Sequence, residues 1–405
     1  MSVPEIKNLE QLLLQHLDKG KSIVATNISR LTSYGENYGS EMLKVDLTLK
    51  DETGHTEELS VVAKLIPESE FFRVLFNVQV SFKVETAFYD TIVPALQEFQ
   101  RQHGVTKVID NFAKFYGART SLEGEVVNED AALILENLKV QGYANVDRHT
   151  GFDLRTTLHL LSVIAKFHAV PLALKLQDIE TFNRKVKPFF ACSNPRSPKP
   201  PVDHILPMLL KALEAKESCI RLLPKLSKSL KHFGGVVTED FREPFATISH
   251  KDMWVNNLMV KFEAGEPVDS KIVDFQMYSY DSPVVDLLFF LMTSVETEVL
   301  KANLDCFLEH YHRVFIDTLK SLGCDVEPFS YKNFMEEIAV GVERELAHAC
   351  FMLCFVVRVK NPMVPPDGAF DGPPPAMEEV HFSDDTLDRV CWILEECDRR
   401  GWMNF

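Results

Sequence analysis

The sequence predicts an α+β protein with two lobes, a small antiparallel β-sheet lobe followed by a larger, mainly helical lobe. Strand-like runs with few helices occupy the first third of the chain, whereas helical spacing of apolar residues dominates the rest. The chain of 405 residues also exceeds the roughly 250–300 residues at which a single hydrophobic core stops growing. We therefore expect one lobe over residues 1–138 and a second lobe over residues 139–405.

The first lobe is expected to combine a sheet with two helices. Residues 6–17 repeat apolar residues at helical spacing, whereas residues 45–50 alternate apolar and polar side chains as a strand does. Five strands with one helix after the third form a small antiparallel sheet rather than a doubly wound one. We expect helices over 6–17 and 78–100, and strands over 22–31, 42–49, 58–66, 107–116 and 131–136.

The second lobe is expected to be helical with one interruption. Short β-type runs occur at 245–249, 258–262 and 271–275. Proline-containing segments at 193–202 and 361–375 predict loops, which are either mobile lids or plain surface connections. Helices are expected over 153–171, 205–232, 283–295, 297–322, 329–358 and 383–399.

The charge and hydropathy of the chain argue against several partners. A net charge of −16 repels phosphate backbones and anionic lipids, so we expect no nucleic acid partner. The first residues are charged where a signal peptide would be apolar. The apolar segments 284–292 and 350–357 are far shorter than the roughly 20 residues that span a bilayer, so no membrane insertion is expected.

The chain has eight cysteines, and none forms a C-x-x-C pair. Cys350 and Cys354 are four residues apart, but no second close pair accompanies them, as most zinc sites require. We interpret the cysteines as buried free thiols, which fits the reducing cytosol. A cytoplasmic location is therefore expected.

The segment from His250 to Gln276 carries the strongest chemical pattern in the chain. It contains H-x-D-x-x-x-x-N, formed by His250, Asp252 and Asn257. Asp274 follows an apolar run twenty-two residues beyond Asp252. A three-residue pattern alone arises easily by chance, but an expected strand on each side and a second acid at hairpin distance favour a functional site.

These residue types match the needs of phosphoryl transfer. A carboxylate orients the attacking hydroxyl and accepts its proton, and oxygen ligands hold magnesium against the phosphates. Asp252 fits the base. Asn257 and Asp274 fit the metal, because Mg²⁺ prefers hard oxygen ligands and keeps several waters. The cofactors expected on this interpretation are ATP and Mg²⁺.

The first lobe supplies the other parts of such a site. Lys64 lies in an apolar strand, where a lysine is either an edge residue reaching solvent or a phosphate ligand. Ser33 to Ser40 form a hairpin whose small residues bring backbone amides close to phosphates, although it lacks G-x-G-x-x-G and GK[ST]. Glu85 on the next helix is placed to pair with Lys64, the alternative being a solvated carboxylate.

As a set, the motifs resemble those of the ecdysteroid kinase-like family, which is related to choline kinases and aminoglycoside phosphotransferases. The resemblance implies a two-lobed protein-kinase-like fold and an ATP-dependent kinase. The motifs are Gly35-Glu36-Asn37-Tyr38 with Ser40, Lys64, Phe82-x-x-Glu85-x-x-Phe88-Tyr89, Leu133 to Leu138, Ala165-Lys166-Phe167-His168-Ala169, His250-x-Asp252-x-Trp254-x-Asn256-Asn257, Asp274-Phe275-Gln276 and Ser282-Pro283-x-x-Asp286-Leu287.

The resemblance also implies residue roles. Asp252 is the catalytic base, with Lys251 and His250 beside it in the catalytic set, and Asn257 and Asp274 are the magnesium ligands. The nucleotide-binding residues are Gly35, Asn37, Tyr38 and Ser40 of the hairpin, Lys64 with its partner Glu85, and Glu136 to Leu138 as a hinge offering backbone groups to adenine. His250 is expected to brace the catalytic loop, His168 to be a satisfied core or supporting histidine, and Asp286 to anchor the loop by hydrogen bonds.

Two positions differ from the motifs of related kinases. Lys251 stands where the family usually carries a small or neutral residue, and its cation either binds the transferring phosphate or points to solvent. Gln276 replaces the glycine of the protein-kinase Asp-Phe-Gly, and no Ala-Pro-Glu segment follows. Protein substrates are therefore not expected.

The function expected is transfer of the γ-phosphate of ATP to a hydroxyl of a small molecule, an ecdysteroid or another lipophilic alcohol. A catalytically silent nucleotide- or ligand-binding pseudokinase is the alternative. A hydrolase that uses Asp252 and Asp274 leaves Lys64 and Glu85 unexplained. The expected partner is the small-molecule acceptor, and the sequence indicates no obligatory protein partner.

Overall fold

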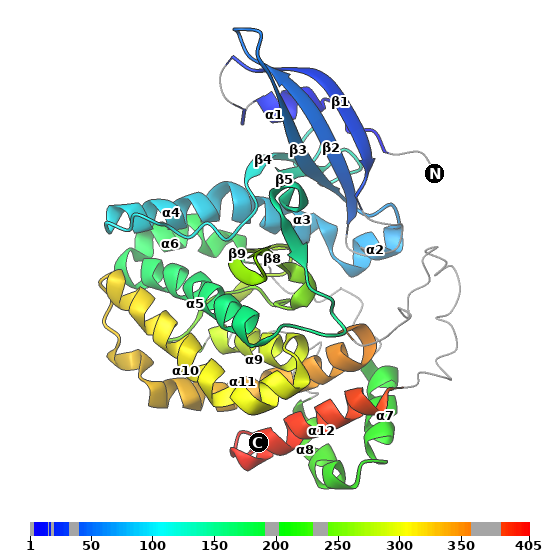
Figure 1. Cartoon of the computed structure of the whole chain (residues 1–405), viewed down its shortest axis with the longest axis vertical. Helices are drawn as coiled ribbons and strands as arrows, with labels where there is room; N and C mark the ends of the chain where they lie inside the picture. The colour runs from blue at the N-terminus through cyan, green and yellow to red at the C-terminus, as the bar shows by residue number, and fades with distance from the viewer. Residues whose placement is uncertain are drawn as a thin grey trace.

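The computed structural model describes residues 4–14, 16–17, 20–31, 40–190, 202–229, 242–357 and 382–405. A small sheet stands on a larger helical body (Figure 1), which is the two-lobed α+β kinase-like fold that the sequence predicts. Gly35, Asn37 and Tyr38 of the predicted hairpin lie outside the described residues, as do the 361–375 segment and all of the 193–202 segment except its last residue.

The first lobe is a five-stranded antiparallel sheet in the order β1-β2-β3-β5-β4. Leu43, Val45 and Leu47 are fully buried on one face of β2, because successive side chains of a strand point to opposite faces. They pack in a small core together with residues of α1. The elements are α1 (Leu9–Leu14), β1 (Ser22–Arg30), β2 (Glu41–Lys50), β3 (Thr56–Leu65), β4 (Phe115–Arg119) and β5 (Ala132–Glu136).

One continuous helix follows the third strand, as the spacing over 78–100 predicts. It consists of α3 (Val78–Ala87), the π-helical turn η1 (Phe88–Ile92) and α4 (Val93–Gln102), and a short helix, α2 (Glu70–Leu75), precedes it. Its buried residues belong to the large core of the second lobe, and α4 lies along that lobe (Figure 1). Because the sheet ends at Glu136, we propose a lobe boundary near residue 138, with this helix packed across it.

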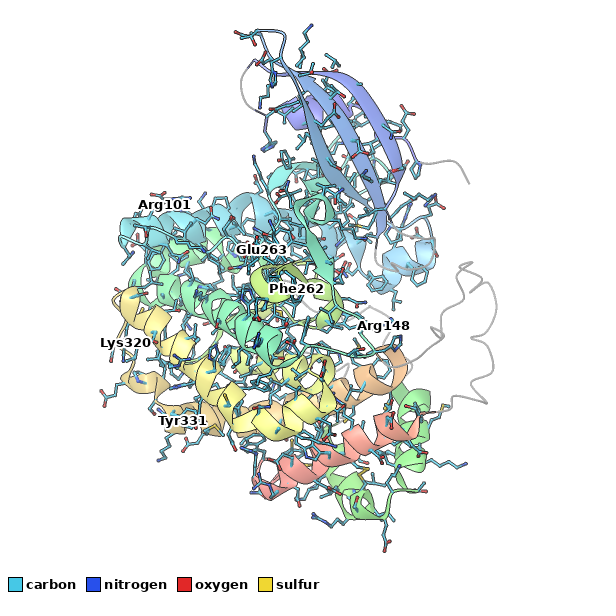
Figure 2. All side chains as sticks on the ribbon, in the orientation of Figure 1. Arg101, Arg148, Phe262, Glu263, Lys320 and Tyr331 are labelled. Atoms are coloured by element: carbon cyan, nitrogen blue, oxygen red, sulfur yellow. A yellow bond between two sulfur atoms is a disulfide. The ribbon has the colours of Figure 1, made fainter. Side chains whose placement is uncertain are left out.

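The second lobe is built around α5, whose start is capped by Asp153 accepting a hydrogen bond from the Thr156 amide at 2.8 Å. By length and composition α5 could cross a membrane, but 78% of its most apolar window is buried inside the protein. Figure 2 shows side chains filling the space around it, whereas the labelled Lys320 and Tyr331 lie at the surface. The helices are α5 (Leu154–Gln177), α6 (Ile179–Lys185), α7 (Val202–Leu213), α8 (Leu223–Ser229), α9 (Pro283–Ser294), α10 (Thr297–Ser321), α11 (Tyr331–Met352) and α12 (Asp384–Arg399).

Short strands and turns interrupt the helices of this lobe, as the sequence predicts. Two small antiparallel sheets have the orders β6-β8-β9 and β10-β7. The elements are β6 (Tyr143–Asn145), β7 (Thr247–Ser249), η6 (Val255–Asn257), β8 (Leu258–Glu263), β9 (Glu266–Ile272) and β10 (Ser279–Asp281), with the helical turns η2 (Leu138–Gln141), η3 (Lys187–Phe189), η4 (Glu217–Leu222), η7 (Glu327–Phe329) and η8 (Leu353–Val357) elsewhere.

Several predicted elements are wrong in extent. The helix expected over 6–17 is formed by Leu9–Leu14, and the helix expected over 153–171 continues to Gln177. The strand expected over 107–116 begins only at Phe115, because the Ile109 amide donates to the Gln100 side chain and the Asn111 carbonyl accepts the Ile272 amide. The helix expected over 205–232 is broken into α7, η4 and α8. The strand expected over 271–275 ends at Ile272, and Asp274 has a left-handed backbone with φ of 68°.

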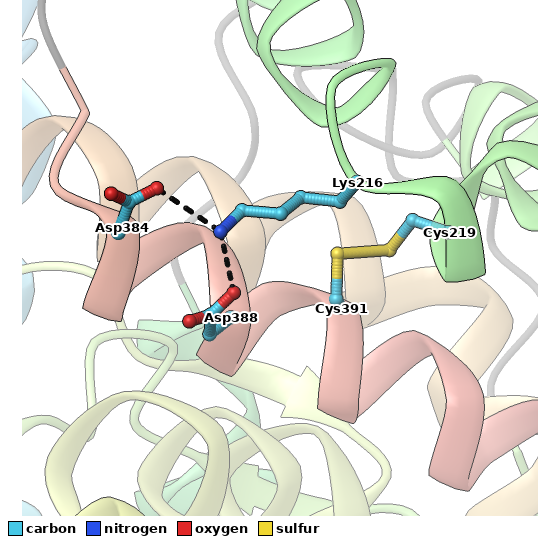
Figure 3. The surroundings of a disulfide bond; sticks show 5 residues. All are labelled: Lys216, Cys219, Asp384, Asp388 and Cys391. Atoms are coloured by element: carbon cyan, nitrogen blue, oxygen red, sulfur yellow. Dashed lines mark hydrogen bonds and ion pairs between the residues drawn. A yellow bond between two sulfur atoms is a disulfide. The ribbon is translucent and has the colours of Figure 1, made fainter.

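The cysteine prediction is wrong for one pair. Cys219 of η4 and Cys391 of α12 form a disulfide, with their Cα atoms 5.5 Å apart (Figure 3). They are 172 positions apart, so no local spacing could reveal the pair. Lys216 reinforces the same junction with ion pairs to Asp384 at 3.1 Å and to Asp388 at 2.6 Å. The free cysteines in the described residues are Cys306, Cys324, Cys350, Cys354 and Cys397.

Cys391→Ser is expected to lower the free energy of unfolding by roughly 2–4 kcal/mol, because the crosslink restricts the unfolded chain over a long loop. Chemical denaturation monitored by circular dichroism measures the change. Cys306→Ser, which alters an exposed free thiol, is the matched control. A Cys391→Ser protein as stable as this control would show that the crosslink adds nothing to the fold.

Candidate active site

The predicted catalytic loop connects β7 to β8 and is held at both ends by α9. Asp286, in the first turn of α9, accepts hydrogen bonds from the backbone amides of His250 at 2.5 Å and Lys251 at 2.9 Å. Ser294, the last residue of α9, accepts one from the Val255 amide at 3.0 Å. The prediction that Asp286 anchors the loop is confirmed.

Asp286 is itself oriented by His168 of α5. His168 Nε2 lies 3.0 Å from Asp286 Oδ2, and its Nδ1 lies 2.7 Å from the Tyr311 hydroxyl. All three side chains are buried. His168 is therefore the supporting histidine that the sequence predicts, and Tyr311 is a partner that sequence analysis missed, because 143 positions separate the two residues.

His250 braces the loop from inside. Its Nε2 donates to the Val273 carbonyl at 3.0 Å, and its Nδ1 accepts the Asp252 amide at 3.3 Å. Burial lowers the pKa of His250, against opposing contributions from Asp286 and Asp274. A neutral imidazole with both nitrogens engaged holds the backbone of Asp252 in place and is enclosed by protein.

The predicted metal pair is brought together by the pairing of β8 with β9. Leu258 faces Ile272 in this register, and the Val273 amide donates to the Asn257 carbonyl at 3.0 Å. Asn257 and Asp274 thus stand at the same end of the hairpin. The Asn257 amide nitrogen donates to Asp252 Oδ2 at 2.8 Å, which leaves the amide oxygen as the atom suited to a cation.

Lys64 of β3 joins the two lobes at the site. Its ammonium lies 2.7 Å from Glu85 Oε2 and 2.6 Å from Asp274 Oδ1. Burial lowers the pKa of Lys64, but Asp274 and Glu85 together raise it by more. Burial raises the pKa of Glu85 to about 7, against the lowering effect of Lys64. Of the two interpretations open for this lysine, the solvent-reaching edge residue is excluded.

Aromatic packing fixes the Asp274 segment against the helix that carries Glu85. The Phe275 ring stacks on Phe88 at 3.6 Å with an interplanar angle of 9°, and the His250 ring contacts Phe275 edge-on at 4.8 Å. Phe88 opens the π-helical turn of that helix, a feature that often marks functional positions. The two carboxylates that meet Lys64 are therefore held by one packed unit.

The surroundings of Asp252 disfavour the ionised form of its carboxyl group. Burial and the neighbouring Asp274 raise the pKa of Asp252 to about 7, whereas His348 and hydrogen bonds from Asn257 and Trp254 lower it. A carboxyl whose pKa lies near neutrality combines a substantial ionised fraction with basicity, as a general base requires.

The predicted hinge lies at the end of β5. Asn137 is buried, donates to the Ser60 hydroxyl at 3.0 Å and accepts the Lys139 amide at 3.2 Å. The Glu136 carboxylate accepts the Lys114 amide at 3.2 Å, and the Leu138 side chain is buried. The backbone amides of Glu136 and Asn137 donate to the carbonyls of Lys114 at 2.8 Å and Ser60 at 3.4 Å, and the adenine-binding role of this hinge stays a prediction. Ser40 precedes β2 beside the end of β3 that carries Lys64.

The Lys251 side chain is paired with a carboxylate instead of pointing freely to solvent, and its contact with the transferring phosphate stays a prediction. Its ammonium lies 3.1 Å from Asp281 Oδ2, and the Arg344 guanidinium of α11 grips both oxygens of Asp281 at 2.6 and 2.8 Å. His348, one turn further along α11, stacks on Phe289 at 4.6 Å and hydrogen-bonds to Glu345. No local pattern reveals these residues, because they lie 30 or more positions from Lys251.

The donor set fits a magnesium ion that nucleotide phosphates help to hold. Within the described ranges, no group of three or more His, Cys, Asp or Glu side chains is arranged to hold a metal ion. One carboxylate from Asp274 and one amide oxygen from Asn257 are hard ligands, and Mg²⁺ sites of kinases typically complete such a set with phosphates and waters. The residues present therefore suit a metal–nucleotide complex better than a free metal.

Several solved structures match over most of the chain at low identity. A GDP complex of a mutant of aminoglycoside 2′-phosphotransferase-IIIa has a TM-score of 0.38 and 12% identity, covering 98% of this chain and 99% of that one. An ethanolamine kinase of Plasmodium vivax has a TM-score of 0.37 and 10% identity, covering 93% and 84%. Scores this low transfer no substrate to this chain.

The sequence itself gives the stronger comparison. No curated protein matches the chain. The model of the ecdysteroid kinase-like family matches residues 34–324, a range that includes Lys64, Glu85, the catalytic loop and Asp274. This match covers most of the chain and confirms the resemblance carried by the motifs. The protein belongs to the ecdysteroid kinase-like family.

Proposed function

We propose that the protein is an ATP-dependent kinase that transfers the γ-phosphate to a hydroxyl of a small molecule, an ecdysteroid or another lipophilic alcohol. One observation carries the proposal. Lys64 of the sheet reaches Glu85 and Asp274 at ion-pair distance, while Asn257 hydrogen-bonds to Asp252 beside them. Phosphoryl transfer needs this combination of base, metal ligands and phosphate-binding cation.

The acceptor side of the reaction belongs to Asp252. Its carboxylate accepts the proton of the attacking hydroxyl, and the hydrogen bond from Asn257 keeps it oriented. Asp286 accepts the His250 amide, and the His250 ring accepts the amide of Asp252 itself. The base is thereby fixed before the acceptor binds, which avoids reorganisation during the reaction.

The nucleotide side belongs to the first lobe and to the hairpin of β8 and β9. Lys64, positioned by Glu85, contacts the phosphates, and Asn257 with Asp274 would hold Mg²⁺. When bound, the metal neutralises charge that develops on the phosphates. The main-chain groups of Glu136 to Leu138 receive adenine, and Ser40 with Gly35, Asn37 and Tyr38 completes the phosphate-binding hairpin.

A phosphoryl-transfer screen tests the proposal. The purified chain is incubated with γ-labelled ATP and Mg²⁺, together with panels of hydroxylated steroids and other lipophilic alcohols, and labelled products are separated. The proposal expects a labelled product that requires Mg²⁺ and disappears when Asp252 is replaced by Asn. Stabilisation by ATP without turnover on any acceptor would instead indicate a nucleotide-binding pseudokinase.

The activity is expected to rise with pH through about 7. Asp252 accepts a proton only when ionised, and its pKa is raised to about 7 by burial and by Asp274, so the protonated form dominates below this value. A carboxyl with its ordinary pKa, near 4, would give a flat profile over the same range. The pH dependence of kcat/KM for the free enzyme makes the measurement, and a flat profile would contradict the base assignment.

We propose the cytoplasm as the compartment, because ATP is the expected donor. The Cys219–Cys391 disulfide points instead to an oxidising environment, where such bonds persist. Alkylation of thiols in denaturant at the moment of cell lysis, followed by mass spectrometry, distinguishes the two, because both cysteines are buried in the folded chain. Alkylated Cys219 and Cys391 support the cytoplasm, and protected ones contradict it.

A further inference from the structure

The backbone at Lys251 is in a conformation that side chains disfavour. Its φ is 69°, in the left-handed region where glycine has no steric penalty. Asp286 accepts the amides of both His250 and Lys251 at this turn. A glycine would adopt the turn more easily, so the lysine stands there at a conformational cost. Backbone strain of this kind is typical of functional positions.

The side chain of Lys251 forms one end of a three-membered ion cluster. Its ammonium pairs with Asp281, the last residue of β10, at 3.1 Å, and Arg344 holds the same carboxylate with two hydrogen bonds. Asp281 is buried with 4% of its surface exposed. A buried carboxylate is favourable only while it is paired, and the fork of an arginine fixes its orientation.

The cluster connects three segments around the catalytic base. Lys251 directly precedes Asp252, Asp281 follows Asp274 by seven positions, and Arg344 comes from the middle of α11. α11 approaches α9 closely at Gly341, where a Cβ atom would lie 2.5 Å from the Val284 side chain. This close approach places Arg344 within reach of Asp281, which lies just before α9.

We propose that Lys251 is a positioning residue whose ion pair with Asp281, clamped by Arg344, holds Asp252 in the geometry for proton abstraction. The inference rests on the proposed kinase function. The cluster ties the catalytic loop to the segment that follows the metal-binding aspartate and to α11. Without the lysine the turn at residue 251 is still held by Asp286, but the side that bears Asp252 loses its link to α11.

Two substitutions at residue 251 distinguish a positioning role of Lys251 from no role in the reaction. Lys251→Gly removes the ammonium and relieves the left-handed backbone, whereas Lys251→Arg keeps a cation. The readouts are turnover of ATP with Mg²⁺, with water as acceptor, and the melting temperature. Ala264→Gly is the matched control, because Ala264 has φ of 51° in an exposed turn between β8 and β9, so it relieves similar strain away from the site.

Lys251→Gly is expected to lower kcat by roughly tenfold to a hundredfold, the range in which misplacement of a catalytic group acts. KM for ATP is expected to stay at the native value, and the melting temperature is expected not to fall. Lys251→Arg is expected to recover most of the loss, and Ala264→Gly to keep the native kcat. In the background of Asp281→Asn, Lys251→Gly is expected to have little further effect, because the two act as one unit.

Two results would overturn the inference about Lys251 while leaving the proposed kinase function in place. One is a native kcat in Lys251→Gly, and the other is a full loss of kcat from Lys251→Gly in the Asp281→Asn background. The second would mean that the ammonium acts directly on the phosphates. A native chain that neither binds nor turns over ATP overturns the proposed function, and the inference falls with it. The failures are therefore distinguishable by the behaviour of the native chain.

Discussion

Asp252→Asn is expected to lower phosphoryl transfer by about 10²–10⁴-fold, the usual contribution of a general base, while making the folded protein more stable. Asparagine can still accept the hydrogen bond that Asn257 donates, so the loop keeps its geometry. It cannot accept the proton of the attacking hydroxyl. Binding of ATP, measured by calorimetry, is expected to be retained, because the proposed function assigns Asp252 to the acceptor and not to the nucleotide.

The gain in stability follows from the raised pKa of Asp252. Burial and Asp274 raise it to about 7 from an ordinary value of 3.8, so the folded protein resists ionisation that the unfolded chain accepts. The resulting destabilisation grows from about pH 4 and is complete above about pH 7, where it amounts to roughly 2–4 kcal/mol. Asp252→Asn removes it, so the gain in melting temperature is expected to be largest at alkaline pH and to vanish towards pH of about 4.

Asp317→Asn, at an exposed position of α10, is the matched control for both measurements. It removes one negative charge without touching the site, and native turnover and stability are expected. If Asp252→Asn transfers phosphate at the native rate, Asp252 is not the base. If Asp252→Asn transfers no phosphate but unfolds at a lower temperature than the native chain, ionised Asp252 does not destabilise the folded protein.

Asp274→Asn is expected to abolish the dependence of ATP binding on Mg²⁺. An amide in place of the carboxylate removes the only anionic ligand of the proposed metal pair, Asn257 and Asp274, and hard cations need such a ligand. The native chain is expected to gain about 2.7 kcal/mol of stability from ATP and Mg²⁺ at roughly a hundred times the dissociation constant. The variant is expected to gain no more with Mg²⁺ than with ATP alone.

Thermal unfolding with ATP in the presence of Mg²⁺ or a chelator makes this measurement. Lys64 keeps its ion pair with Glu85 at 2.7 Å, so the variant retains a cation for the phosphates and is expected to bind metal-free ATP. A full Mg²⁺ response in Asp274→Asn would contradict the metal assignment. Asp252→Asn serves as the comparison, because it removes an equal charge from the acceptor side.

The fold was predictable where local patterns decide it. The alternation in β2 and the helical spacing over 78–100 identified a sheet lobe with one long helix, and the structure confirms both. The strand expected at 107–116 failed because Ile109 and Asn111 bond to a helix and to β9. Such long-range partners leave no trace in a window of ten residues.

The site was predictable as a set of residue types, and less so as a network. Lys64 meets Glu85 as their motifs suggest, and the structure adds an ion pair between Lys64 and Asp274. The partners of Lys251 were not foreseeable, because a lysine in a turn gives no sign of which carboxylate it meets. The disulfide between Cys219 and Cys391 was missed for the same reason, since spacing along the chain carries no information about contacts between distant elements.

If the sheet rocks as a rigid body, the division of the apolar core decides where it turns. Most buried apolar residues of β2 and β3 belong to the small core with α1, while the helix that carries Glu85 belongs to the large core. β5 gives alternate residues to both cores, as Ile134 and Leu133 illustrate, and would act as the pivot. A rocking sheet would carry Lys64 away from Glu85 and Asp274. Nucleotide exchange would then require one lysine to release two carboxylates, and no large apolar surface would have to separate.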